Sequence, residues 1–159
     1  MKRILDVCCG SRMFWFNKTH KDTVFADVRN CSLAIKDSGC ASGIRHIIIS
    51  PDVQADFVHL PFADETFSMV VIDPPHLLHG GKNSWMVKKY GKLPMQWKHI
   101  IHDGFVECMR VLKKNSILVF KWSANDISTK AVLDVIPFNP LFGHPTKRHG
   151  HTIWMVFMK

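Results

Sequence analysis

The chain has 159 residues, a formal net charge of +8, ten histidines and five cysteines. This length is enough for a hydrophobic core but not for two, so we expect residues 1–159 to form a single domain. No apolar run approaches membrane-spanning length and no cleavable signal precedes the first strand, so we expect a cytoplasmic protein without a membrane anchor. The odd number of cysteines favours free thiols over a disulfide framework. A basic balance of this size favours nucleic acid as a partner, with a merely basic surface as the alternative.

Buried strands are predicted where β-branched and apolar residues run together between turn signals. These runs are residues 3–7, 23–27, 46–50 with 53–57, 68–72, 116–122, 138–142 and 152–159. Helical spacing of apolar residues predicts helices over 96–113 and 125–136, and the apolar run 13–16 predicts one or two further helical turns over a pocket. Residues 28–44 contain too many helix breakers for a helix and favour a hairpin. The pattern indicates an α/β fold.

The buried run 68–72 stops abruptly at Asp73-Pro74-Pro75-His76. Prolines have a fixed φ and no N–H, so they neither extend a ladder nor enter a helix, and the Asp73 carboxylate and the Pro74 carbonyl stay free as acceptors. Ligands bind beyond the carboxyl ends of strands in open α/β sheets. Two such acceptors can take both N–H bonds of an exocyclic amino group and free its lone pair, with His76 against the ring. The alternative is that the prolines merely end a strand.

Acidic residues also follow the other predicted strands. Asp6 lies near the end of the first predicted strand, just before the tight turn that contains Gly10, where the lack of a Cβ lets a ligand approach the backbone. Asp27 ends the second strand about twenty residues after that turn, which is where a carboxylate grips a ribose diol. Asp56 closes the third extended segment. Exposed strand-end carboxylates are the alternative interpretation.

Together these motifs resemble those of the class I S-adenosylmethionine-dependent methyltransferases, and in particular the DNA and RNA amino-methyltransferases of the adenine-N6 type. The matching segments are Asp6-Val7-Cys8-Cys9-Gly10-Ser11, Ala55-Asp56-Phe57 with Leu60-Pro61-Phe62, and Asp73-Pro74-Pro75. Two positions depart from the family pattern: Arg12 stands where a further glycine is usual, and His76 where Tyr, Phe or Trp is usual. The resemblance covers essentially the whole chain in the family's order.

The resemblance implies a Rossmann-like fold with a mostly parallel seven-stranded sheet and an antiparallel last strand. It also implies S-adenosyl-L-methionine as cofactor, and we expect no metal. The cofactor-binding residues that it implies are Asp6, Cys8, Cys9, Gly10, Asp27, Asp56 and Phe57, and the catalytic ones are Asp73, Pro74, Pro75 and His76. The expected substrate is the adenine amino group in DNA, with RNA next. The alternatives are a protein glutamine N-methyltransferase and a non-catalytic methyltransferase-fold subunit that binds nucleic acid for a partner.

The segment after the Asp-Pro-Pro motif, residues 77–97, mixes lysines with aromatic residues and contains no acid. Its glycine pair permits a mobile lid, and interleaved lysine and aromatic side chains suit phosphates and unstacked bases. The expected substrate-binding residues are Lys82, Trp85, Lys88, Lys89 and Tyr90. A solvated basic loop is the alternative. The hairpin expected at 28–44 would leave one sheet face thinly covered, which a second copy or a partner subunit could complete.

Overall fold

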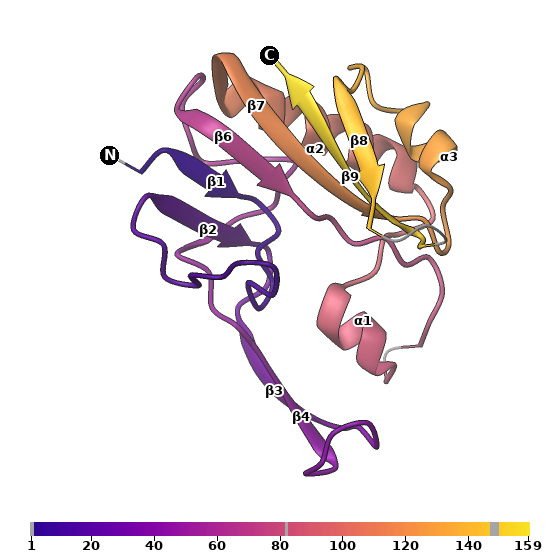
Figure 1. Ribbon diagram of the computed structural model, residues 1–159. Helices are drawn as coiled ribbons and strands as arrows, with labels where there is room; N and C mark the ends of the chain where they lie inside the picture. The colour runs from indigo at the N-terminus through magenta and orange to yellow at the C-terminus, as the bar shows by residue number, and fades with distance from the viewer. Residues whose placement is uncertain (1, 82, 147–149) are drawn as a thin grey trace.

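The structure is a computed structural model that describes residues 2–81, 83–146 and 150–159. Its main element is a seven-stranded sheet with the order β5-β2-β1-β6-β7-β9-β8 (Figure 1). The strands are β1 (Ile4–Asp6), β2 (Thr23–Asp27), β5 (Val53–Gln54), β6 (Phe67–Ile72), β7 (Leu112–Ser123), β8 (Phe142–Pro145) and β9 (Thr152–Met158). The first five in that order pair in parallel, whereas β9 is antiparallel to both β7 and β8. This confirms the predicted sheet and its antiparallel last strand.

Two helices, α2 (Trp97–Val111) and α3 (Thr129–Leu133), lie on one face of the sheet, and α1 (Trp85–Tyr90) lies beyond the strand ends (Figure 1). The predicted helix over 96–113 is confirmed as α2, because its apolar residues recur on one face and bury against the strands. Within the described residues, no helix is both long and apolar enough to span a membrane.

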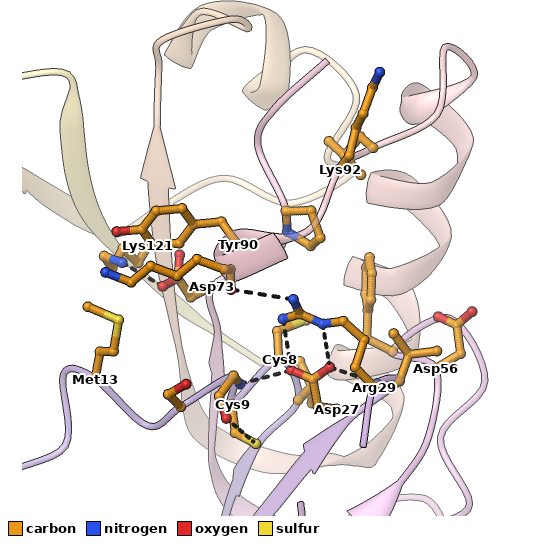
Figure 2. A pocket seen from close by; sticks show the side chains of 18 of the residues that line it. Cys8, Cys9, Met13, Asp27, Arg29, Asp56, Asp73, Tyr90, Lys92 and Lys121 are labelled. Carbon is orange, nitrogen blue, oxygen red and sulfur yellow. Dashed lines mark hydrogen bonds and ion pairs between the residues drawn. The ribbon is translucent and has the colours of Figure 1, made fainter. Parts of the chain in front are cut away.

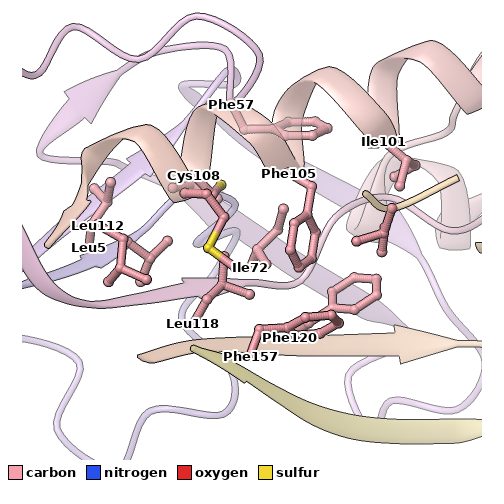
Figure 3. Packing of buried hydrophobic residues seen from close by; sticks show 14 of the residues in the cluster. Leu5, Phe57, Ile72, Ile101, Phe105, Cys108, Leu112, Leu118, Phe120 and Phe157 are labelled. Carbon is pink, nitrogen blue, oxygen red and sulfur yellow. The ribbon is translucent and has the colours of Figure 1, made fainter. Parts of the chain in front are cut away.

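The core fills the space between α2 and one face of the sheet (Figure 3). Leu5, Val70 and Leu118 are in register on adjacent strands, so their side chains share that face, and all three are fully buried. Phe105 of α2 packs edge-on against Phe157 of β9, with ring centroids 4.7 Å apart. Burying this apolar face fixes α2 against the sheet and so sets the position of the loops at both of its ends.

A second, two-stranded sheet is made by β3 (Cys31–Lys36) and β4 (Ile44–Ile49), which form an antiparallel hairpin that projects from the body (Figure 1). The predicted hairpin over 28–44 is therefore confirmed. The prediction that residues 46–50 continue the third strand of the main sheet is wrong, because these residues pair with β3. Only the two residues of β5 join the main sheet at this edge, next to β2.

Three other predicted elements differ from the structure. Residues 13–16 form turns instead of a helix, because Arg12 has φ +54° and its guanidinium donates to the Lys18 carbonyl, which folds the segment back. The helix predicted over 125–136 is reduced to α3, which begins after Ser128, whose hydroxyl accepts from the Ala131 N–H. The strand predicted over 138–142 starts only at Phe142. Pro140 lacks the N–H that a ladder through 138–142 would need.

Gly104 of α2 lies directly against the side chain of Phe57. A Cβ at this position would lie 2.0 Å from Cε2 of Phe57. We expect Gly104→Ala to destabilise the fold by about 1–3 kcal/mol through overpacking, which outweighs the roughly 0.5–1 kcal/mol that alanine gains inside a helix. Urea unfolding measures the difference. Asp103→Ala, at an exposed neighbouring position, is the control, and a Gly104→Ala variant as stable as the unmodified chain would contradict this packing.

Candidate active site

A cavity of about 410 Å³ opens beyond the carboxyl ends of β1, β2 and β6 (Figure 2). Its wall joins segments far apart in the sequence: the turn after β1, the end of β2, the loop after β5, the residues after β6 and the end of α1. The cavity is within the size range of small-molecule and cofactor sites. Of the predicted site residues, it is lined by Cys8, Cys9, Gly10, Asp27, Asp56, Phe57, Asp73, Pro75, Lys89 and Tyr90.

The turn after β1 presents backbone to the cavity. Gly10 has φ +48°, a conformation that glycine adopts without strain. Its N–H donates to Oδ2 of Asp27 over 2.8 Å, and the Cys9 N–H donates to the Ala26 carbonyl over 2.9 Å. The turn is thus fastened to the end of β2. Burial raises the pKa of the Cys9 thiol to about 12, so this cysteine lines the cavity as a neutral thiol.

Asp6, predicted as a cofactor ligand, lies beneath this turn instead of in the cavity wall. Its carboxylate is fully buried and accepts from Nε1 of Trp15 over 2.7 Å and from the Cys8 N–H over 3.3 Å. Burial raises its pKa from 3.8 to about 7, against the opposing effect of the Trp15 hydrogen bond. Asp6 therefore shapes the turn from below.

Asp27 ends β2 inside the cavity wall, and its hydrogen-bonding capacity is already used. Besides the Gly10 N–H, the carboxylate accepts from the backbone N–H of Arg29 over 2.9 Å and from its Nε over 3.2 Å, with Nη2 at 3.5 Å. A carboxylate has about four lone-pair sites. A ribose diol at Asp27 would have to displace the Arg29 side chain.

The same guanidinium also holds α1. Nη1 of Arg29 lies 3.4 Å from the carbonyls of both Lys88 and Lys89. These are among the last carbonyls of the helix, which have no partner inside it, and a cation there is favourable for the helix dipole. Arg29 thus ties α1 to the end of β2.

Asp73 directly follows β6 and points into the cavity, where its Oδ2 pairs with Nζ of Lys121 from β7 (Figure 2). Burial raises the pKa of Asp73, while the Lys121 ammonium counteracts that rise. The two side chains are only 19% and 25% exposed, so solvent screens the pair weakly.

Phe57 and Asp56 reach the cavity from the loop after β5, which α2 holds in place. The Leu60 N–H donates to Oε1 of Glu107 over 2.8 Å, and Arg110 donates to the Leu60 and Phe62 carbonyls. Asp56 is exposed at the cavity rim, whereas Phe57 is buried beneath α2.

Pro75 lines the cavity, whereas the other two residues of the Asp-Pro-Pro-His motif, Pro74 and His76, lie behind its wall. Pro74 and His76 are buried, and the His76 ring packs near Tyr90 and Trp122, with centroids 5.8 Å and 6.4 Å away. Burial lowers the pKa of His76. In this arrangement His76 supports the base of α1, and its predicted stacking against a substrate ring stays a prediction.

In the predicted lid, Lys89 and Tyr90 face the cavity, and Nζ of Lys89 lies 4.9 Å from the Tyr90 ring centroid. Trp85 and Lys88 do not line the cavity; Trp85 instead faces Arg45 of the projecting hairpin, 5.4 Å from ring centroid to Cζ. Lys82 lies outside the described residues. None of these five substrate-binding roles is tested by the geometry.

Among the cavity residues that the sequence analysis did not predict, Arg29 and Lys121 are the two that form ion pairs with predicted site residues. Lys121 is the lone charge in the apolar run 116–122, and strand alternation places it opposite the core-facing residues Phe120 and Trp122. A single charged residue inside an apolar run could therefore have identified Lys121 as a candidate site residue from the sequence. Arg29 follows Asp27 by two residues, but only the fold brings its side chain under α1.

The cavity residues fit S-adenosylmethionine in kind. A turn whose backbone is unobstructed at Gly10 can accept the methionine part, and Asp56 can accept from an adenine amino group. Asp27 can accept from ribose hydroxyls once the Arg29 side chain has moved away from it. Among the described residues, no group of three or more potential metal ligands comes together.

The strand order, with β9 inserted antiparallel between β7 and β8, defines a Rossmann-like fold of the class I methyltransferase type. No family model and no curated protein matches the chain. The structure is similar to that of a TehB-like SAM-dependent methyltransferase from Corynebacterium glutamicum, with TM-score 0.58 and 12% identity over 99% of this chain and 80% of that one. It is also similar to a SAM-dependent methyltransferase from Thermotoga maritima, described as a possible histamine N-methyltransferase, with TM-score 0.52 and 13% identity over 99% and 82%. At these identities, the similarity establishes the fold.

The buried Asp6 predicts an unusual pH dependence of stability. Because its folded pKa of about 7 lies above its ordinary 3.8, its contribution to stability is full below about pH 4 and is lost as the pH rises through 7. A shift of this size corresponds to at most about 4 kcal/mol. We expect urea unfolding to give a lower free energy of unfolding at pH 8 than at pH 5. Asp6→Asn, which cannot ionise, should flatten this dependence, and equal slopes for both chains would contradict the assignment.

The hydrogen bonds from Arg29 to the last carbonyls of α1 predict that this helix opens more often when the Arg29 side chain is removed. Arg29→Ala should increase hydrogen exchange at the Lys88 and Gly91 amides by about tenfold, as expected for loss of roughly one charge-assisted hydrogen bond. Hydrogen–deuterium exchange measured residue by residue tests this. Arg3→Ala, which removes an exposed arginine far from α1, is the control, and unchanged exchange in Arg29→Ala would refute the tie.

Proposed function

We propose that this chain is an S-adenosylmethionine-dependent methyltransferase that modifies an exocyclic amino group of a nucleobase, with adenine N6 in DNA as the preferred target and RNA next. One observation carries the proposal: Asp73 reaches the same cavity as the Gly10 turn and Asp27. An acceptor for an amine and a site for the cofactor are thereby within one cavity, at the sheet edge where ligands bind in such folds.

Bound at the Gly10 turn, S-adenosylmethionine would supply an electrophilic methyl group to an amine held in line with it. The Asp73 carboxylate would orient the amine by accepting from its N–H groups, which frees the nitrogen lone pair. The Pro74 carbonyl, predicted as the second acceptor, belongs to a buried residue outside the cavity lining. After transfer, the surplus proton would pass to Asp73. Burial favours this step, because it raises the pKa of Asp73.

The charge of the molecule supports a nucleic acid substrate. The chain carries a net +8, and Arg29, Lys89 and Lys92 lie around the cavity. Cations at this position can contact phosphates on either side of a base that has left its stack. Extracting a base from a duplex costs a few kcal/mol, so single-stranded substrates should be used first.

Replacing Asp73 tests the proposal. We expect the unmodified chain to bind S-adenosylmethionine in calorimetry and to transfer labelled methyl to single-stranded DNA, RNA or both. Asp73→Ala should lower transfer by about 100-fold or more, because the amine loses its main acceptor, and should leave cofactor affinity within about tenfold.

Asp134→Ala is the matched control, because Asp134 is exposed at the end of α3 and, among the residues that the structure describes, pairs with Lys130 alone. Labelling of protein alone would favour a glutamine amide substrate, and cofactor binding without transfer to any pool would favour a non-catalytic subunit. Full activity of Asp73→Ala would remove the proposed role of this residue.

A further inference from the structure

Asp73 and Lys121 form a paired donor and acceptor at the base of the cavity. Ile72 of β6 is in register with Phe120 of β7, so the residues that follow them lie side by side at the ends of parallel strands. Nζ of Lys121 lies 2.5 Å from Oδ2 of Asp73, and both side chains line the cavity (Figure 2).

The Lys121 ammonium is held by its surroundings. It lies 5.6 Å from the ring centroid of Phe14 and 5.8 Å from that of Trp154, its register partner on β9. The two rings themselves meet edge to face at 5.4 Å. Cation–π contacts on two sides restrict a side chain that is otherwise flexible. Lys121 is therefore a pre-organised donor, with one N–H on Asp73 and two others available.

An acceptor next to a donor is complementary to a ligand that carries a donor next to an acceptor. An adenine or cytosine edge has this form, since the exocyclic NH₂ neighbours a ring nitrogen with a free lone pair. We infer that Lys121 is a specificity-determining residue, which donates to the ring nitrogen beside the amino group that Asp73 accepts from. The inference rests on the proposed function. It narrows the substrate to amino groups bonded to a ring carbon that is next to a ring nitrogen with a free lone pair.

Such a pair discriminates against other amines. An alkyl amine has no neighbouring acceptor for Lys121, and it is protonated near neutral pH, so two cations would meet in a partly buried site. Sites built around a hydrogen bond reject analogues that lack it, because the buried donor is then left without a partner. Lys121 also favours the ionised form of Asp73, which accepts and does not donate. In the described part of the chain, the other ionisable groups near Asp73 are Asp6, Cys8 and His76.

The test uses single-stranded DNA oligonucleotides with one target base, either deoxyadenosine or deoxy-1-deazaadenosine, in which a C–H replaces the ring nitrogen N1. For the unmodified chain we expect kcat/KM to be about 10- to 100-fold lower with the deaza base, the effect of losing a hydrogen bond to a charged donor. Lys121→Met should be slower on adenine and should lose most of the preference for adenine over the deaza base, measured as the ratio of the two kcat/KM values. Lys121→Arg, which keeps a cationic donor, should restore part of the preference.

The comparison between variants cancels the different intrinsic reactivity of the two amines. A merely structural role for Lys121 would slow both substrates and leave their ratio unchanged, and that result would overturn the inference. Equal use of both bases by the unmodified chain would overturn it as well, while leaving the proposed function intact. Transfer to neither oligonucleotide would instead overturn adenine as the target, and with it this reading of Lys121.

Discussion

Three neighbouring parallel strands, β1, β2 and β6, each lead into an aspartate at the same edge of the sheet. The site depends on how the negative charge of each of these carboxylates is compensated. Removing a carboxylate from water is costly unless it is paired or protonated. The chain uses a different solution for each. Asp6 is fully buried with a pKa raised to about 7, Asp27 is surrounded by backbone N–H groups and Arg29, and Asp73 is paired with Lys121. The character of the cavity follows from these differences.

The balance also determines which aspartates remain available to a ligand. Asp6 faces Trp15 and the turn backbone, so it acts on the shape of the turn. Within the described ranges Lys121 is the one cation that pairs with Asp73, and Asp73 stays open to the cavity, which leaves it lone pairs for an amine. This asymmetry is the physical basis for giving the acceptor role to Asp73.

The parts of the fold that the sequence predicted well are those set by local patterns. An apolar run predicted β2, helical spacing of apolar residues predicted α2, and the proline pair after Asp73 predicted the stop where the cavity lies. The failures come from long-range contacts. Arg12 folds residues 13–16 into turns through contacts with Ser50 and Asp52, about forty residues away. Asp126 accepts from the Leu78 and His79 N–H groups, which holds the start of the segment predicted as a helix over 125–136 in a turn. No local pattern could report such contacts.

The residues of the candidate site also divide into those that a local sequence pattern predicts and those that only the fold brings together. Each strand-end acid could be predicted, because it follows directly from where a strand stops, whereas its side-chain partner could not, because the fold decides that Arg29 turns onto Asp27 and that Lys121 meets Asp73. Asp27 shows the consequence most clearly. Its predicted role toward a ribose requires Arg29 to move, and Arg29 also holds the last carbonyls of α1. Occupation of the cofactor end of the cavity and the position of α1 are therefore linked through one guanidinium. The helix α1 also carries Tyr90 into the cavity. A movement of the Arg29 side chain would therefore connect binding of the proposed cofactor near Asp27 with the position of Tyr90 on the side where the amine would bind.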